Sequence, residues 1–138
     1  MKELVRACAG HEVIRPPPGV LIIITSDMVT EDELNRMCAR AVFMEVCIEI
    51  KNSKFKSLRC PNLKELKPCR PGRPALRIEY NVNFEVLLIP PNVKYPPGAQ
   101  IIEVKRNPPL RKDIIRQLQR WCPHCRITPD YGLLIYPT

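Results

Sequence analysis

Two closely spaced residue pairs in the sequence are suited to holding a metal ion. Cys122 and Cys125 are separated by two residues, the spacing at which two thiolates bind one tetrahedral zinc ion. Cys8 and His11 repeat this spacing and would supply the other two ligands of a closed site. The pattern predicts a zinc site of three cysteines and one histidine, which joins the start of the chain to the end of a second helix.

Other roles for the cysteines stay open. Cys60 and Cys69 are rival zinc ligands from a basic part of the chain. The pair at 122–125 also has the spacing of a thiol–disulfide exchange motif, although it follows a helix instead of opening one. The remaining alternative is that the thiols are structural and simply buried.

The start of the chain and its apolar runs bear on where the protein resides. Glu3, Arg6 and His11 interrupt any apolar stretch of the kind found in a secretory leader. The longest apolar run, residues 20–24, is far shorter than the roughly 20 residues that cross a bilayer. We therefore expect an intracellular protein without a membrane partner. Its seven cysteines, an odd number, should then stay reduced.

A second pattern lies in the first predicted helix. Leu34, Cys38 and Val42 follow one another at intervals of four residues, so they would share one helix face. This spacing matches the elongin-binding box of cullin ubiquitin ligase receptors, an amphipathic helix that enters a pocket on its partner. Glu33 departs from the box, in which a small residue precedes the leucine. The alternative is ordinary core packing, because any amphipathic helix shows the same spacing.

The net charge of +8 suggests a third kind of partner. Basic residues gather in segment 51–74 and on a second predicted helix, where a set of four would contact phosphates: Arg111, Lys112, Arg116 and Arg120. This gives the alternative hypothesis of a zinc-stabilised nucleic-acid-binding module, against the simpler interpretation of a solvated basic surface. The sequence contains no phosphate-loop, dinucleotide or serine-hydrolase motif, so we expect no enzyme.

Hydrophobic periodicity indicates the elements that must position these residues. Residues 20–25 are an apolar run typical of a central strand buried on both faces, and residues 46–50 predict the next strand. Between them, Thr30 and Glu33 form a capping box that starts an amphipathic helix. Residues 51–74 lack a clear period and are expected to form an irregular basic insertion.

The second half of the chain predicts further strands and one helix. Residues 75–89 alternate between apolar and polar side chains, as one half-buried strand or two strands with a bend would. Residues 101–104 predict a short edge strand, and Asn107 is expected to cap a helix opened by the prolines that follow it. Residues 133–136 predict a final strand.

These elements fit one domain spanning residues 1–138, of the α/β (α+β) class. Their order predicts a ferredoxin-like β-α-β-β-α-β sandwich, with two helices on one face of a mainly antiparallel sheet. We see no internal repeat in the sequence.

Three short motifs together resemble the adenovirus early region 4 34K protein family. They are Asp-Met-Val-Thr with Glu-Leu in residues 27–34, Cys-Arg-Pro-Gly in 69–72 and Cys-Pro-His-Cys in 122–125. The family's clustered cysteine and histidine runs are absent, and the chain is shorter. The resemblance implies a small viral regulatory adaptor in the nucleus and cytoplasm of a host cell. Such an adaptor recruits a host elongin–cullin ubiquitin ligase to cellular targets, usually with a second viral protein, and here Leu34, Cys38 and Val42 would be its ligase-binding box.

Overall fold

The chain winds so that strands distant in sequence lie side by side and run in the same direction. The computed structural model describes residues 1–127, and the statements on structure below concern these residues. In chain order the elements are α1 (Lys2–Cys8), β1 (Val13–Ile14), β2 (Leu21–Ile24), α2 (Glu31–Ala39), β3 (Phe43–Ser53), β4 (Ser57–Arg59), β5 (Glu65–Pro68), β6 (Leu76–Asn81), β7 (Val86–Leu88), β8 (Ile102–Lys105), α3 (Lys112–Trp121) and β9 (Arg126–Ile127).

The largest run of strands follows the order β2-β3-β6-β8-β9, and each pairing in it is parallel. Ile22 pairs with Ile48, Ile48 with Leu76 and Leu76 with Ile102, so successive partners are 26, 28 and 26 residues apart. Parallel strands added at a nearly constant period form a solenoid, and this period falls within the roughly 20–29 residues of leucine-rich repeats. We call these five strands the main sheet.

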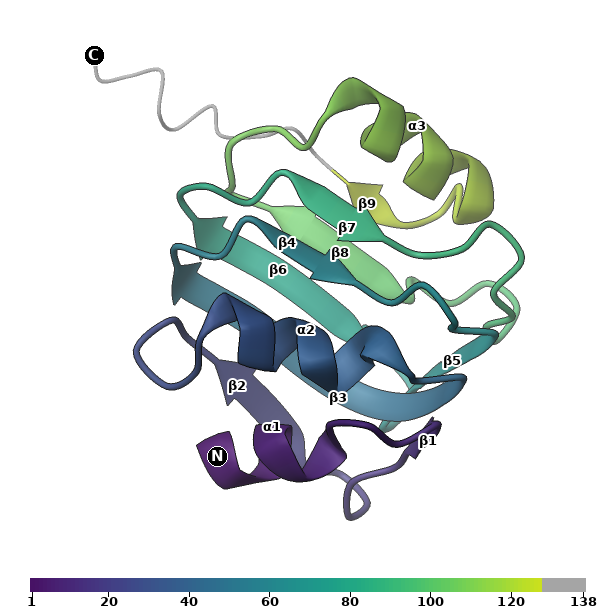
Figure 1. Ribbon diagram of the computed structural model, residues 1–138. Helices are drawn as coiled ribbons and strands as arrows, with labels where there is room; N and C mark the ends of the chain where they lie inside the picture. Colours follow the sequence, from purple (N-terminus) through teal and green to yellow (C-terminus); the bar gives the residue numbers. More distant parts are fainter. Residues whose placement is uncertain (128–138) are drawn as a thin grey trace.

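The solenoid has three sides. β3 is long enough to belong to two of them, because residues 43–46 pair with β1 and β5 whereas residues 47–53 pair with β2 and β6. The third side consists of α1, α2, β4, β7 and α3, which are stacked in that order from one end of the solenoid to the other (Figure 1). Each coil therefore contributes one element to the third side before the chain returns to the main sheet.

The core lies between the three sides and is filled by every second residue of the main-sheet strands. Ile22, Ile48, Leu76 and Ile102 share one register position and are buried. The position two residues further along each strand is likewise buried and aliphatic: Ile24, Ile50, Ile78 and Val104. Side chains alternate between the two faces of a strand, so the intervening positions point outward.

Two asparagines connect successive coils inside the turn that ends each main-sheet strand. Asn81 Nδ2 donates to the carbonyl oxygen of Ile50 at 3.0 Å, and Asn107 Nδ2 donates to that of Ile78 at 2.8 Å. Both asparagines are buried, and each donates to a backbone carbonyl of the preceding coil. Together, Asn81 and Asn107 form a buried asparagine ladder. The sequence predicted that Asn107 caps a helix, but its side chain is bound in this ladder instead.

The predicted ferredoxin-like sandwich is wrong. The described sheets contain more strands than that fold, and their pairings are parallel instead of antiparallel. Segment 51–74 contains β4 and β5 and completes one coil of the solenoid instead of forming an irregular insertion. β2 lies at an edge of the main sheet and β8 lies inside it, the reverse of the prediction.

The helices follow the sequence prediction in part. The capping box at the start of α2 is confirmed, since Thr30 Oγ1 accepts from the Glu33 N–H at 3.1 Å and Glu33 accepts from the Thr30 N–H at 3.0 Å. α2 ends at Ala39, so Val42 is not on it. α3 begins at Lys112, later than predicted. The strand predicted at 133–136 lies outside the described residues.

Candidate functional site

The predicted zinc site is wrong. Cys122 and Cys125 form a disulfide, so neither sulfur is a thiolate that could bind a metal. Cys8 is buried on α1, whereas the 122–125 pair follows α3 at the opposite end of the solenoid (Figure 1). His11 is exposed. Nowhere in residues 1–127 do three His, Cys, Asp or Glu side chains gather in a way that could hold a metal ion.

The remaining cysteines are also paired, with one exception. Cys38 is bonded to Cys60 and Cys47 to Cys69, and each pair is separated by 22 residues, slightly less than one coil. The expectation of reduced cysteines and of rival zinc ligands at 60 and 69 is therefore wrong. Cys8 keeps a free thiol in the described chain, and burial raises its pKa, which makes the thiol unreactive.

The predicted ligase-binding helix keeps its key side chains inside the protein. Leu34 and Cys38 are 0% exposed. Val42 follows the helix, and its N–H donates to the Glu12 carbonyl at 2.7 Å. A leucine already packed in the core cannot fill a partner's pocket unless α2 leaves the solenoid. The elongin-binding box stays a prediction, and this burial weighs against it.

The predicted nucleic-acid-binding residues are accessible on α3. Arg111, Lys112, Arg116 and Arg120 are all exposed. Arg111 also pairs with Asp113 at 2.9 Å, and this hydrogen bond lowers the pKa of the Asp113 carboxyl. The other basic region, segment 51–74, forms β4 and β5 in a different coil, while α3 packs against β7 and β9. This binding role stays a prediction.

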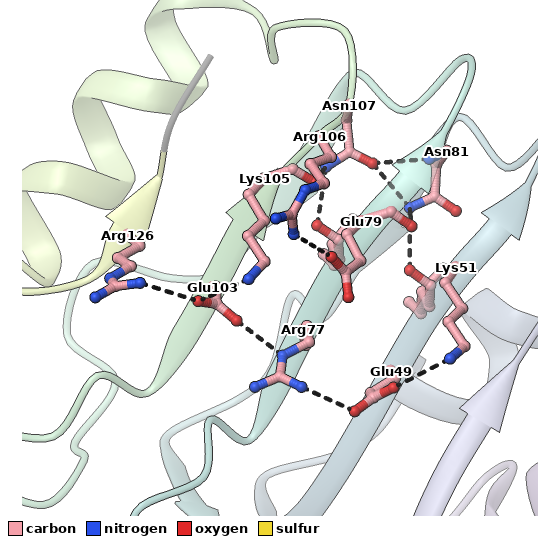
Figure 2. Close-up of polar contacts among 12 residues, drawn as sticks. Glu49, Lys51, Arg77, Glu79, Asn81, Glu103, Lys105, Arg106, Asn107 and Arg126 are labelled. Atoms are coloured by element: carbon pink, nitrogen blue, oxygen red, sulfur yellow. Dashed lines mark hydrogen bonds and ion pairs between the residues drawn. The ribbon is translucent and has the colours of Figure 1, made fainter. Parts of the chain in front are cut away.

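The outward face of the main sheet carries charged side chains in two rows (Figure 2). Strand register aligns Glu49, Arg77 and Glu103 in the first row, which Arg126 on β9 extends. The second row holds Lys51, Glu79 and Lys105. We call these seven residues the charged lattice.

Opposite charges are neighbours both along and across the lattice. Arg77 bridges the first row, since its Nε donates to Glu103 Oε1 at 2.8 Å and its Nη1 to Glu49 Oε2 at 3.1 Å. Between the rows, Lys51 Nζ lies 3.7 Å from Glu49 and Lys105 Nζ lies 3.6 Å from Glu103. Cross-strand pairs of opposite charge stabilise a sheet by roughly 0.2–1 kcal/mol each. The ion pairs within the lattice therefore stabilise the sheet by themselves, without a bound ligand.

The carboxylates of the lattice are covered, whereas its cations reach solvent. The side chains of Glu49 and Glu103 are 10% and 11% exposed, whereas the lattice cations are more accessible, from 27% for Lys105 to 65% for Arg126. Arg73, outside the lattice, adds a further cation beside Glu49 at 3.2 Å. An approaching molecule thus meets N–H donors and positive charge, which favours an acidic partner.

A repeated backbone turn ends the lattice strands. Asn52, Tyr80 and Arg106 hold equivalent positions in three coils and have φ values of 51°, 60° and 56°. A left-handed conformation costs a residue such as tyrosine on the order of 1–3 kcal/mol, whereas asparagine tolerates it better. Tyr80 is 47% exposed, with the Arg106 guanidinium carbon 5.6 Å from its ring centroid. Rigidly held tyrosine and arginine are the residue types that dominate binding at protein interfaces.

A cavity of about 660 Å³ lies at the other end of the lattice strands, where they begin. It is bounded by two loops, 67–74 and 96–100, and by the lattice residues Arg77 and Glu103. Its size lies within the roughly 300–1,000 Å³ of ligand-binding pockets. The cavity and the lattice are therefore one continuous surface.

Comparison with known proteins does not assign the chain to a class. It matches no protein-family model and no curated protein. The resemblance to the adenovirus early region 4 34K family therefore stays a prediction. None of the helices in the described part of the chain is long and apolar enough to cross a membrane.

The charged lattice is not apparent within any single strand, because its charges alternate between strands that lie a full coil apart. Three hexapeptides fall into register: IEIKNS at 48–53, LRIEYN at 76–81 and IEVKRN at 102–107. They share aliphatic first and third positions, yet the second and fourth positions change sign from one coil to the next. A search for segments 26–28 residues apart that alternate in charge would have found the repeat.

Proposed function

We propose that this chain is a recognition domain that binds an acidic surface of a partner protein through the charged lattice. The observation that carries the proposal is the asymmetry of the lattice, in which covered carboxylates hold partly exposed cations in fixed positions. Such positions let a partner bind without a large loss of side-chain freedom, because the ion pairs already restrict the rotamers.

The ends of the lattice strands add anchoring groups for the same partner. Tyr80 and Val82 are among the exposed large hydrophobic residues of the described chain, at 47% and 62%. Arg106 lies beside Tyr80 and also pairs with Glu79 at 3.1 Å. Aromatic residues and arginine are enriched among the dominant residues of protein interfaces, so Tyr80 and Arg106 are suitable anchors beside the lattice.

The disulfides support an oxidising compartment. Three bonds join six of the seven cysteines, and disulfides of this density persist outside the reducing cytosol. We therefore propose the secretory pathway or the outside of the cell for this domain, as an alternative to the nucleus and cytoplasm predicted from the sequence. The non-enzymatic role is part of the same proposal.

The experiment compares two charge-reversal variants that are matched in number and sign. Lys51→Glu with Lys105→Glu reverses two lattice cations, and Lys112→Glu with Arg116→Glu reverses two cations on α3. The wild-type domain, displayed as a tetramer, is first used to select partners from an array of secreted and cell-surface proteins. The affinity of each variant for the selected partner is then measured by surface plasmon resonance.

We expect the lattice variant to bind at least about tenfold more weakly, which corresponds to about 1.4 kcal/mol, and the α3 variant to bind like wild type. The wild-type affinity should fall as salt rises, because the contacts are between exposed charges. Equal affinities of the lattice variant and wild type would refute the proposal. A loss confined to the α3 variant, with binding of duplex DNA by wild type, would favour the nucleic-acid alternative.

A further inference from the structure

We infer that the cavity at the start of the lattice strands binds a short acidic and aromatic segment of the partner, with a side-chain carboxylate on its cations and an aromatic ring against its prolines. This inference rests on the proposed function, because it names the chemistry of the partner at one end of the same surface. It concerns the cavity between loops 67–74 and 96–100, which we call the loop pocket.

The base of the loop pocket offers guanidinium nitrogens that are already oriented. Arg77 donates from Nε to Glu103 and from Nη1 to Glu49. Arg73 donates to Glu49 from Nη2 at 3.2 Å. Within residues 1–127, Nη2 of Arg77 and the Nε and Nη1 atoms of Arg73 make no hydrogen bond. Arg77 therefore keeps one nitrogen and Arg73 keeps two for a bound carboxylate, and hydrogen bonds between a guanidinium and a carboxylate are stronger than neutral ones.

The balance of charge in the loop pocket favours an anion. Lys67, Arg73 and Arg77 line it together with one carboxylate, Glu103. Arg73 and Arg77 also pair with Glu49, at 3.2 and 3.1 Å, so three cations are set against two carboxylates. The Lys67 side chain is 46% exposed, and its Nζ lies 3.6 Å from Glu65 and 5.8 Å from the centroid of the Phe43 ring. Its ammonium can therefore turn toward a bound carboxylate at little cost.

The walls of the loop pocket are apolar and stiff. Pro68, Pro71 and Pro74 form one wall, and Pro96 with Ala99 forms part of the other. Proline has a fixed φ and no side-chain rotamers to order, so a ring packed against it costs little conformational entropy. Apolar walls beside cations suit a segment that carries an aromatic side chain next to an acidic one, whereas a purely acidic chain would leave the prolines uncovered.

Both loops are anchored by covalent and polar contacts. Cys69 is bonded to Cys47, and its N–H also donates to the Val46 carbonyl at 3.0 Å. Behind the second loop, Tyr95 Oη donates to the Trp121 carbonyl at 2.9 Å and Trp121 Nε1 donates to the Val93 carbonyl at 2.8 Å. A pocket with anchored walls is formed before the ligand arrives, which is the condition for binding a short flexible segment.

The test uses a defined probe in place of the unidentified partner. Unlabelled peptide GDYDG, acetylated and amidated so that its only carboxylates are in side chains, is titrated into the domain and followed by isothermal titration calorimetry. Peptides GNYNG and GDADG remove the charge and the ring in turn. Three variants are compared with wild type: Lys67→Gln with Arg73→Gln, Ala99→Trp to fill the pocket, and Lys112→Gln with Arg116→Gln as the matched control. Thermal denaturation confirms that each variant is folded.

We expect GDYDG to bind at least about tenfold more tightly than either altered peptide. The pocket variants should each lose about tenfold or more in affinity for GDYDG, and the α3 control should lose nothing. Absence of saturable binding to wild type at millimolar peptide, or equal affinities of wild type and both folded pocket variants, would overturn the inference. If Ala99→Trp is unfolded, the Lys67 and Arg73 changes, which are outside the hydrophobic core, still decide the outcome.

The proposed function can fail separately from this inference. Partner binding that is lost in the Lys51→Glu, Lys105→Glu variant but kept in Ala99→Trp would leave the charged lattice as the interface and remove the loop pocket from it. Peptide binding at the loop pocket, without any effect of the lattice variant on the selected partner, would remove the lattice instead.

Discussion

Replacing Asn81 by alanine should destabilise the solenoid more than any exposed substitution near it. Asn81 Nδ2 donates to the Ile50 carbonyl at 3.0 Å and to Asn107 Oδ1 at 3.0 Å, and Asn81 Oδ1 accepts from the Ser53 hydroxyl. Alanine leaves the buried Ile50 carbonyl without this donor and the buried Ser53 hydroxyl without this acceptor. Asn107 Oδ1 keeps the Asn81 backbone N–H at 2.9 Å, so it is not orphaned.

The expected loss follows from the groups left without a partner. A buried polar group without a partner costs roughly 1–3 kcal/mol, and the hydroxyl recovers part of its loss by rotating. We therefore expect Asn81→Ala to lower the free energy of unfolding by about 3 kcal/mol. For a domain of this size, a loss of 1 kcal/mol lowers Tm by roughly 4 °C, so Tm should fall by about 12 °C.

The matched control is Asn83→Ala, because Asn83 has the same side chain two residues further on and is exposed. It should change the free energy of unfolding by less than about 0.5 kcal/mol. Urea unfolding followed by circular dichroism gives both values and shows whether the slope with denaturant is unchanged. Equal stability of Asn81→Ala and wild type, or an equal loss in the control, would show that the asparagine ladder does not connect the coils.

Three further outcomes follow from the structure. Cys47→Ala with Cys69→Ala opens a loop of 22 residues and should cost about 3 kcal/mol in urea unfolding, whereas a pair that is reduced in the native protein would show almost no loss. The Arg6 hydrogen bond lowers the pKa of the Glu33 carboxyl in the folded protein, so its stabilisation holds above the unfolded value of about 4.3 and is lost as pH falls through the folded pKa. Wild type should therefore lose stability relative to Glu33→Gln between about pH 6 and about pH 3 in thermal melts, and parallel pH profiles would contradict this. Tyr80→Asn places a residue that tolerates positive φ in a position with φ of 60°, so Tm should stay equal or rise while partner affinity falls; a lower Tm with unchanged affinity would show that Tyr80 serves packing alone.

Local chemistry made some elements predictable from the sequence. The capping box of Thr30 and Glu33 defines the start of α2, because both of its hydrogen bonds form within four residues. The alternation in 75–89 predicted one half-buried strand or two strands with a bend, and the second alternative matches β6 and β7. These signals depend on neighbours in sequence and need no knowledge of the fold.

Long-range pairing was not predictable in the same way. β4 and β5 contain three and four residues, too few for a hydrophobic period to stand out, and parallel partners in an adjacent coil keep them in place. The sequence predicted antiparallel pairing because strands that follow one another along the chain were expected to be neighbours in the sheet. In the solenoid, a full coil of chain instead separates each main-sheet strand from the strand with which it pairs.

The cysteines show how an assumption about compartment shaped the predicted site. Cys122 and Cys125 have the spacing of zinc ligands, but the same spacing allows a disulfide once the compartment is oxidising. The informative signal was the shared separation of 22 residues in Cys38–Cys60 and Cys47–Cys69, which a solenoid brings into contact. Without the coil length, that separation has no structural meaning.

Lysine footprinting of the complex tests most directly whether the charged lattice is the binding surface. The domain is acetylated with and without its selected partner, and the modification of each lysine is quantified by mass spectrometry. Lys51 and Lys105 lie on the lattice, whereas Lys112 lies on α3 and Lys54 follows the end of β3. We predict that the partner protects Lys51 and Lys105 at least about fivefold and leaves Lys54 and Lys112 unchanged, as exclusion of solvent from an interface core requires. Unchanged modification of Lys51 and Lys105 in a complex that protects Lys112 would contradict the account.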